Sequence, residues 1–250
     1  MDNATKRQLK KQDQFHNITE HGLDWAKSNR QSAISLIVGI VGVVLVLVGG
    51  YSLYAHRTEA AATAFGDAMQ VYQTPLANPA QPTPPGMKTF QTAKERAEAA
   101  NPKFVEIASR YGMTKSGRLA EYFAGLTYME EGQNQSAEDA LKKVSGSWDG
   151  GVAALAKMAL AEFYEHNGRY DEAAGLYTEL GNGNAATVPP GLAKIELGEM
   201  YEAQGKVDQA RKLYAEVKDK DKDDKGKAGP AGELAAQKLN PVPVGGLPGQ

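Results

Sequence analysis

The chain has 250 residues, a formal net charge of −2 and no cysteine. The missing thiols exclude disulfides, zinc–thiolate sites, iron–sulfur clusters and cysteine nucleophiles. The four histidines lie far apart in the sequence, and the nearly balanced charge is unlike that of a general nucleic-acid-binding protein. We therefore expect no metal, no cofactor and no nucleic-acid partner.

An uncharged stretch of 23 residues, 33–55, predicts a transmembrane helix. Its sequence is AISLIVGIVGVVLVLVGGYSLYA, which is long enough to cross about 30 Å of hydrocarbon as a helix. Tyr51 and Tyr54 lie at one end, where aromatic rings favour the headgroup region. A cleaved signal peptide is the competing interpretation, but its apolar region is shorter and ends at a site of small residues. We expect an uncleaved membrane helix at 32–56, preceded by an N-terminal segment at 1–31.

The charges beside this stretch predict its orientation. Six basic residues precede it, whereas Arg57 is followed by no further lysine or arginine until Lys88. Basic flanks stay in the cytoplasm, so we expect residues 1–31 to be cytoplasmic and the rest of the chain to lie in the periplasm of a bacterium, with the span in the inner membrane.

Small residues recur within the span, at Ser35, Gly39, Gly42 and Gly49. Small residues on one face of a membrane helix let a second helix approach closely. They predict a contact with another membrane protein, and the alternative is that glycine is simply frequent in membrane helices.

Three later stretches repeat one another. They are AGLTYMEEGQNQSAEDALKKV from Ala124, LAEFYEHNGRYDEAAGLYTEL from Leu160 and LGEMYEAQGKVDQARKLYAEV from Leu197. The recurring residues are Gly125, Ala161 and Gly198; Tyr128, Tyr164 and Tyr201; Gly132, Gly168 and Gly205; Ala137, Ala173 and Ala210; and Leu141, Tyr177 and Tyr214. The spacing is 36 and then 37 residues. This regularity predicts three copies of one structural unit.

The repeated positions are typical of a pair of helices. The small residue and the tyrosine share one helix face, and the middle glycine can adopt the left-handed conformation that ends a helix. We expect the second helix to begin near a polar cap at Ser136, Asp171 or Asp208. This is the tetratricopeptide pattern, which predicts an all-α solenoid with three hairpins at 112–217.

The regions around the repeats are also expected to be helical. Residues 57–111 predict helices that are interrupted by a proline-rich loop at 75–86, the first of them continuing the membrane helix to about Gln73. Residues 218–250 predict a charged linker, a short capping helix at about 232–239 and a flexible tail. Asp219, Asp221 and Asp223 resemble the start of a calcium-binding loop, but its glycine and final glutamate are replaced by Asp224 and Pro230. A solvated linker is therefore the favoured interpretation.

The densest chemical cluster is EFYEHNGRYDEA, residues 162–173. The repeat places its aromatic residues in the core, its glycine in the turn and its alanine in the second helix, which leaves Glu162, Glu165 and His166 for function. The same register assigns a larger set to the concave face of the solenoid: Tyr122, Leu126, Met129, Glu130, Met158, Glu162, Glu165, His166, Ile195, Glu199 and Glu202. An apolar and acidic face predicts a partly basic or apolar polypeptide as its ligand. The alternative is that the glutamates only keep an exposed face soluble.

The order of these parts resembles the YfgM-like ancillary subunit of the bacterial Sec translocon. The likeness covers roughly residues 13–217 and includes WAKSN before the span and KFVEIASRYGMTKSGRLAEYFAGLTYMEEG at the start of the repeats. The resemblance implies association with translocon subunits, periplasmic chaperones and exported polypeptides, without catalysis. Two other functions remain open: a scaffold for cell-envelope assembly or cell division, and an enzyme with a site at Glu162, Glu165 and His166.

Overall fold

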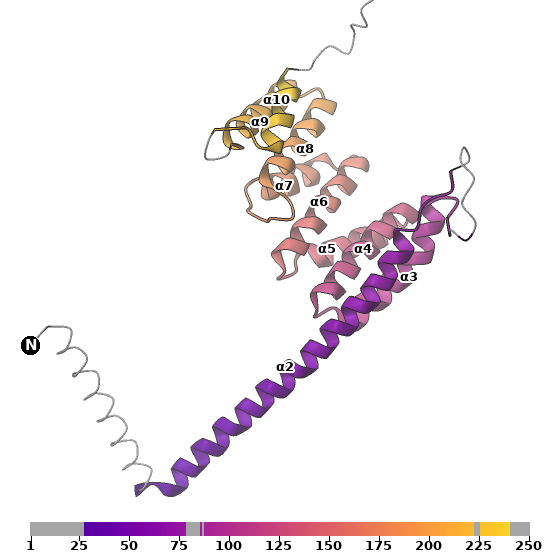
Figure 1. Cartoon of the computed structure of the whole chain (residues 1–250). Coiled ribbons are helices and arrows are strands. Elements are labelled where there is room, and N and C mark those ends of the chain that lie inside the picture. The colour runs from indigo at the N-terminus through magenta and orange to yellow at the C-terminus, as the bar shows by residue number, and fades with distance from the viewer. Residues whose placement is uncertain (1–27, 79–85, 87, 223–225, 241–250) are drawn as a thin grey trace, which may run out of the picture. The chain divides into compact units, whose positions relative to one another are not determined.

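The computed structural model describes residues 28–78, 86, 88–222 and 226–240, and the regular elements in these ranges are helices α2 to α10 (Figure 1). This confirms the predicted all-α class. The chain divides into two compact units, 1–56 and 57–250.

The first described element, α2, runs from Arg30 to Tyr72. Its N-terminal part contains the predicted span, and the large apolar side chains there, such as Leu45 and Val46, are exposed at 66% and 74%. Within the described residues, α2 alone is long and apolar enough to cross a membrane. Such a helix near an N-terminus meets the criteria of length and composition for a span, as the sequence predicted.

The three repeats form three helical hairpins. The first pairs α4 (Lys115–Glu131) with α5 (Asn134–Ser145), the second α6 (Gly150–His166) with α7 (Tyr170–Gly181), and the third α8 (Pro190–Ala203) with α9 (Val207–Lys220). Each helix packs against the next one along the chain, so the hairpins stack in sequence order.

Each hairpin turns at the repeated glycine. Gly132, Gly168 and Gly205 have φ angles of 80°, 75° and 75°, which only glycine adopts without strain. In all three turns the amide after the glycine donates a hydrogen bond of 2.8 Å to the carbonyl of the repeated tyrosine. This closure ends the first helix in the way that the spacing predicted.

The predicted caps of the second helices lie two or three residues after the observed cap positions, which are Gln133, Arg169 and Lys206. Helices α5, α7 and α9 begin at Asn134, Tyr170 and Val207, so Ser136, Asp171 and Asp208 lie inside the first turn. The residues that precede these helices make no side-chain cap bond. The backbone bonds of the glycine turn lead the chain directly into the next helix, and in α7 and α9 the first-turn carboxylates of Asp171 and Asp208 interact favourably with the helix dipole.

The repeated small and large residues form the core where the two helices of a hairpin cross. Leu141, Tyr177 and Tyr214 are almost fully buried. A Cβ atom added at Gly198 would lie 2.5 Å from Cε1 of Tyr214, and one added at Gly125 would lie 2.7 Å from Cγ of Leu141. The small residue is therefore required by the close approach of the helices.

Two further packing groups cover the ends of the hairpin stack. At one end, Phe65 and Tyr72 of α2, Phe104 of α3 (Ala93–Tyr111) and Phe123 of α4 form an aromatic cluster with ring centroids 5.4 to 6.0 Å apart. At the other end, α10 (Pro230–Leu239) packs on α9. Both ends thereby bury an apolar surface that a further repeat would otherwise cover.

The side chain of Asp221 stabilises the start of α10. It accepts a hydrogen bond of 2.7 Å from the amide of Gly232. This residue belongs to the segment that resembles a calcium loop, of which Asp223 and Asp224 lie outside the described residues. The observed role of Asp221 is that of a helix cap.

Candidate partner-binding face

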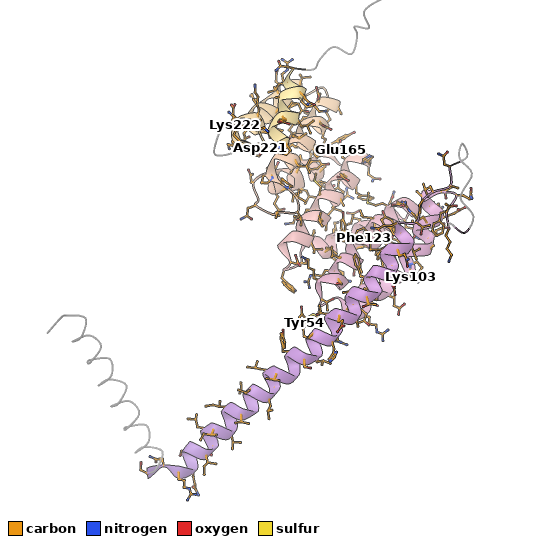
Figure 2. All side chains as sticks on the ribbon, in the orientation of Figure 1. Tyr54, Lys103, Phe123, Glu165, Asp221 and Lys222 are labelled. Atoms are coloured by element: carbon orange, nitrogen blue, oxygen red, sulfur yellow. The ribbon has the colours of Figure 1, made fainter. Side chains whose placement is uncertain are left out.

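The candidate face is made by one side of each first helix, α4, α6 and α8. On α6, Met158, Glu162 and Glu165 recur at the i, i+4, i+7 spacing of a single helix side, and they are partly or fully exposed. The neighbouring Phe163 and Tyr164 are buried. The middle helix therefore presents acidic and apolar side chains at the margin of the core, with Met158 partly buried against it and Glu162 exposed. Figure 2 labels Glu165.

Helix α4 adds an apolar part to this face. Tyr122, Leu126 and Met129 are partly buried and pack against the central hydrophobic core. Glu130 is different, because its carboxylate accepts a hydrogen bond of 2.6 Å from Tyr72 and lies 3.4 Å from the guanidinium of Arg96. Glu130 therefore ties α2 and α3 to α4, which limits its availability to a partner.

Helix α8 differs from its predicted surface. Ile195 is only 1% exposed and packs in a cluster with Tyr214 and with Ala235 of α10. The repeat register placed it on the binding face, but the capping helix covers it. Glu199 and Glu202 remain at the surface as expected.

Glu196 is a further carboxylate near this face, and the sequence prediction of the face did not include it. Burial is the main cause that raises the pKa of Glu196, and the negative charges of Glu199, Glu162 and Glu165 raise it further. Glu196 must therefore lie among the carboxylates of both α6 and α8. Its position three residues before Glu199 on one helix side was the signal that could have identified it.

The carboxylates of this face repel one another. The pKa of Glu162 is raised by burial, and in part by the charge of Glu165, while His166 opposes the rise. His166 lies close to its own helix turn, with Nδ1 2.7 Å from the carbonyl oxygen of Glu162. The face thus concentrates negative charge in partly dehydrated surroundings, where a cation is favoured.

Two core tyrosines and one lysine supply hydrogen bonds and a positive charge to some of these carboxylates. Tyr177 and Tyr214 donate hydrogen bonds of 3.1 Å to Glu165 and Glu202. Nζ of Lys238, on α10, lies 2.8 Å from the carboxylate of Glu199. Lys238 demonstrates that a basic side chain fits against this surface.

The side chains of this face make local contacts within the chain. Within the described residues, no group of three or more His, Asp or Glu side chains could hold a metal ion. Of the three residues considered for catalysis, Glu165 accepts a hydrogen bond from Tyr177, and His166 lies against the backbone carbonyl of Glu162, whose own side chain is exposed. These contacts lie within the middle hairpin.

The small residues of the span form a separate candidate contact. A Cβ atom added at Gly39, Gly42 or Gly49 would meet no heavy atom within 4 Å, and Ser35 donates a hydrogen bond of 3.0 Å to the carbonyl of Gln31. Within the described residues this side of α2 is open, and a helix partner there stays a prediction.

The chain was compared with known protein families, curated proteins and solved structures. A family model described as a tetratricopeptide repeat-like domain matches residues 24–243. No curated protein and no solved structure matches the chain.

Proposed function

Because the chain belongs to the tetratricopeptide repeat-like domain family, we propose that it is a non-enzymatic, membrane-anchored protein whose repeats bind other polypeptides. Domains of this family are repeat scaffolds for protein–protein interaction. The observation that carries the proposal is the partly dehydrated row of carboxylates on α6 and α8, which lies beside the apolar side chains of α4.

The proposed partner segment combines basic and apolar side chains. The carboxylates of Glu162, Glu196 and Glu202 attract cations. The ion pair between Glu199 and Lys238 is an example, within the chain itself, of a lysine bound at this face. Tyr122, Met129 and Met158 offer adaptable apolar contacts to the same segment. An acidic chain terminus is disfavoured, because the carboxylates repel it.

The proposed location is a bacterial inner membrane, with the N-terminus in the cytoplasm and residues 57–250 in the periplasm. Its support is the apolar part of α2 and the basic residues that precede it. An alkaline phosphatase fusion after residue 120 tests this orientation. The fusion is expected to be active, because the enzyme matures only in the periplasm, and an inactive fusion of normal abundance would overturn the orientation.

We further propose that the partners belong to protein export: subunits of the Sec translocon, periplasmic chaperones and newly exported polypeptides. The support is the order of short N-terminal segment, single span and repeats. Purification of the full chain from detergent-solubilised membranes is expected to recover translocon subunits. Recovery of cell-division or envelope-assembly proteins in their place would support the scaffold alternative.

A matched pair of variants tests the binding face. The first carries Glu162→Gln, Glu165→Gln and Glu199→Gln, and the second carries Asp139→Asn, Asp171→Asn and Asp208→Asn on the exposed sides of second helices. Both lose three negative charges. We expect only the first to lose the co-purified partners while keeping its helical circular-dichroism spectrum. Equal recovery with both variants would exclude this face as the binding surface.

A further inference from the structure

Two large apolar side chains stand out on the surface of the unit 57–250. Met113, in the loop between α3 and α4, is 76% exposed, and Trp148, in the loop between α5 and α6, is 75% exposed. Among the described residues of this unit, the other exposed large apolar side chains are exposed by at most 43%. A single exposed apolar side chain is ordinary, but two that are held together form a candidate contact surface.

One buried arginine holds both loops. Nη1 of Arg118, on α4, donates a hydrogen bond of 3.1 Å to the carbonyl of Met113, and its guanidinium carbon lies 3.9 Å from the centroid of the Trp148 ring. Nη2 lies 3.5 Å from the carboxylate of Asp149, and the side chain of Arg118 is 8% exposed. The two loops therefore form one structured surface, here named the Met113–Trp148 rim.

The rim lies at a defined height along α2. Phe123 of α4 packs against Phe65, with ring centroids 5.7 Å apart. Glu130, seven residues after Phe123, bonds to Tyr72, seven residues after Phe65. The two helix segments thus run in the same direction and in step.

The same register can be followed toward the N-terminus. Lys115 begins α4 eight residues before Phe123, and Arg57 lies eight residues before Phe65. At a rise of about 1.5 Å per residue, each interval spans about 12 Å. The rim is therefore level with Arg57, where the chain enters the unit 57–250, two residues after the uncharged stretch ends at Ala55.

We propose that the Met113–Trp148 rim contacts the lipid surface of the membrane that residues 33–55 span. Tryptophan favours the headgroup region, where its ring is shielded and its N–H stays hydrated, and methionine adapts to irregular apolar surroundings. Arg110 and Lys115, which are exposed near the same loops, can pair with anionic headgroups. This inference rests on the proposed membrane anchoring.

Tryptophan fluorescence of the full chain in lipid vesicles tests the proposal. The chain has two tryptophans, so Trp25→Phe leaves Trp148 as the single reporter. Phospholipids that carry a nitroxide on the headgroup are expected to quench Trp148 more strongly than phospholipids labelled at mid-chain. The aqueous quencher acrylamide is expected to quench it less than it quenches free tryptophan.

A matched control places the reporter at the far end of α6. The variant Trp25→Phe, Trp148→Phe, Tyr170→Trp carries its tryptophan just beyond the hairpin turn, about 25 Å from the rim along the helix. Headgroup labels are expected to leave this tryptophan unquenched. Equal quenching of the two reporters would overturn the proposal.

Two further results would also overturn it, for different reasons. If Trp148 is protected from acrylamide but unaffected by labelled lipid, another protein copy covers the rim. If alkaline carbonate extracts the protein from vesicles, the membrane anchoring itself fails and the rim has no bilayer to contact. A protein that resists extraction while Trp148 stays unquenched refutes the rim contact and leaves the anchoring intact.

Discussion

The hydroxyl of Tyr177 donates a hydrogen bond of 3.1 Å to the carboxylate of Glu165, from the second helix of the middle hairpin to the first. Tyr214 and Glu202 repeat this bond, at the same length, in the third hairpin. The first hairpin has Leu141 and Met129 at the equivalent positions. A core residue thus orients a carboxylate of the candidate face in two of the three repeats.

Replacing Tyr177 with phenylalanine is expected to lower the free energy of unfolding by about 1 kcal/mol, because Glu165 loses a donor in partly buried surroundings. Burial raises the pKa of Tyr177, so the hydroxyl stays protonated and able to donate at neutral pH. Denaturant titration of the full chain in detergent, followed by circular dichroism, measures the change. Tyr170→Phe is the control, because that side chain is exposed, and a loss of equal size there would contradict the assignment.

The hairpins could be predicted because the repeated residues are those that the local backbone conformation and the close helix packing require. Only glycine fits the φ angles of 75° to 80° at the three turns, and only a small residue fits where Tyr214 crosses α8. These requirements recur unchanged in each copy, so a comparison of the copies reveals them. The buried tyrosines follow from the same register.

The ends of the stack could not be predicted in the same way, because terminal repeats have different neighbours. Ile195 has the partly buried Met158 as its counterpart in register, yet α10 buries Ile195 almost completely. At the other end, Tyr72 and Arg96 bind Glu130, although they lie 58 and 34 residues away in sequence. Met113 and Trp148 lie in loops outside the register, so the repeat pattern gave no reason to select them.

Alanine at Gly198 is expected to destabilise the fold by about 1–3 kcal/mol, which is typical of overpacking. The added methyl would lie 2.5 Å from the ring of Tyr214, which is itself buried and cannot easily move. Thermal unfolding monitored by circular dichroism measures the effect.

Gly175→Ala serves as the opposite control, because an added Cβ there meets nothing within 4 Å and the position is inside α7. It is expected to stabilise the protein by about 0.5–1 kcal/mol through helix propensity. If both alanine variants shifted the midpoint in the same direction, close packing at Gly198 would not be the cause.

Glu138 connects the first two hairpins, and its contacts are expected to weaken in acid. Its carboxylate accepts hydrogen bonds from Arg169 at 2.8 Å and Tyr164 at 3.0 Å, and it pairs with Lys142 at 2.7 Å. The bond from Arg169 is the main reason that its pKa falls from 4.5 to about 2. A carboxyl with a lowered folded-state pKa stabilises the fold above its unfolded-state pKa and loses that contribution as the pH falls.

The free energy of unfolding is therefore expected to fall between about pH 4.5 and pH 2 in the wild type. Glu138→Gln is expected to be less stable at neutral pH and to show a shallower fall over this range. The neighbouring Asp139→Asn, with an exposed side chain, should keep the wild-type slope. Denaturant midpoints across the pH series give the comparison, and parallel curves for wild type and Glu138→Gln would refute the contact's role.

Binding of a basic partner is expected to weaken on mild acidification. The pKa values of Glu162 and Glu196 are raised above the ordinary value of 4.5, chiefly by burial. These two side chains therefore take up protons at a higher pH than ordinary glutamates do, and each proton removes a negative charge that attracts the partner. A fluorescent peptide of alternating lysine and leucine, titrated with the full chain in detergent between pH 7 and pH 4.5, measures this dependence.

The double variant Glu162→Gln, Glu196→Gln is expected to bind the peptide more weakly at pH 7 and to show a flatter pH profile. Glu172→Gln is a single-charge control outside this face, because Arg169 lowers the pKa of Glu172 and its side chain lies on α7. That control should keep both the affinity and the pH profile of the wild type. If the affinity of the wild type stays constant down to pH 4.5, protonation of Glu162 and Glu196 leaves binding unchanged. That result would show that these two carboxyls, whose pKa values are raised, do not contact the peptide.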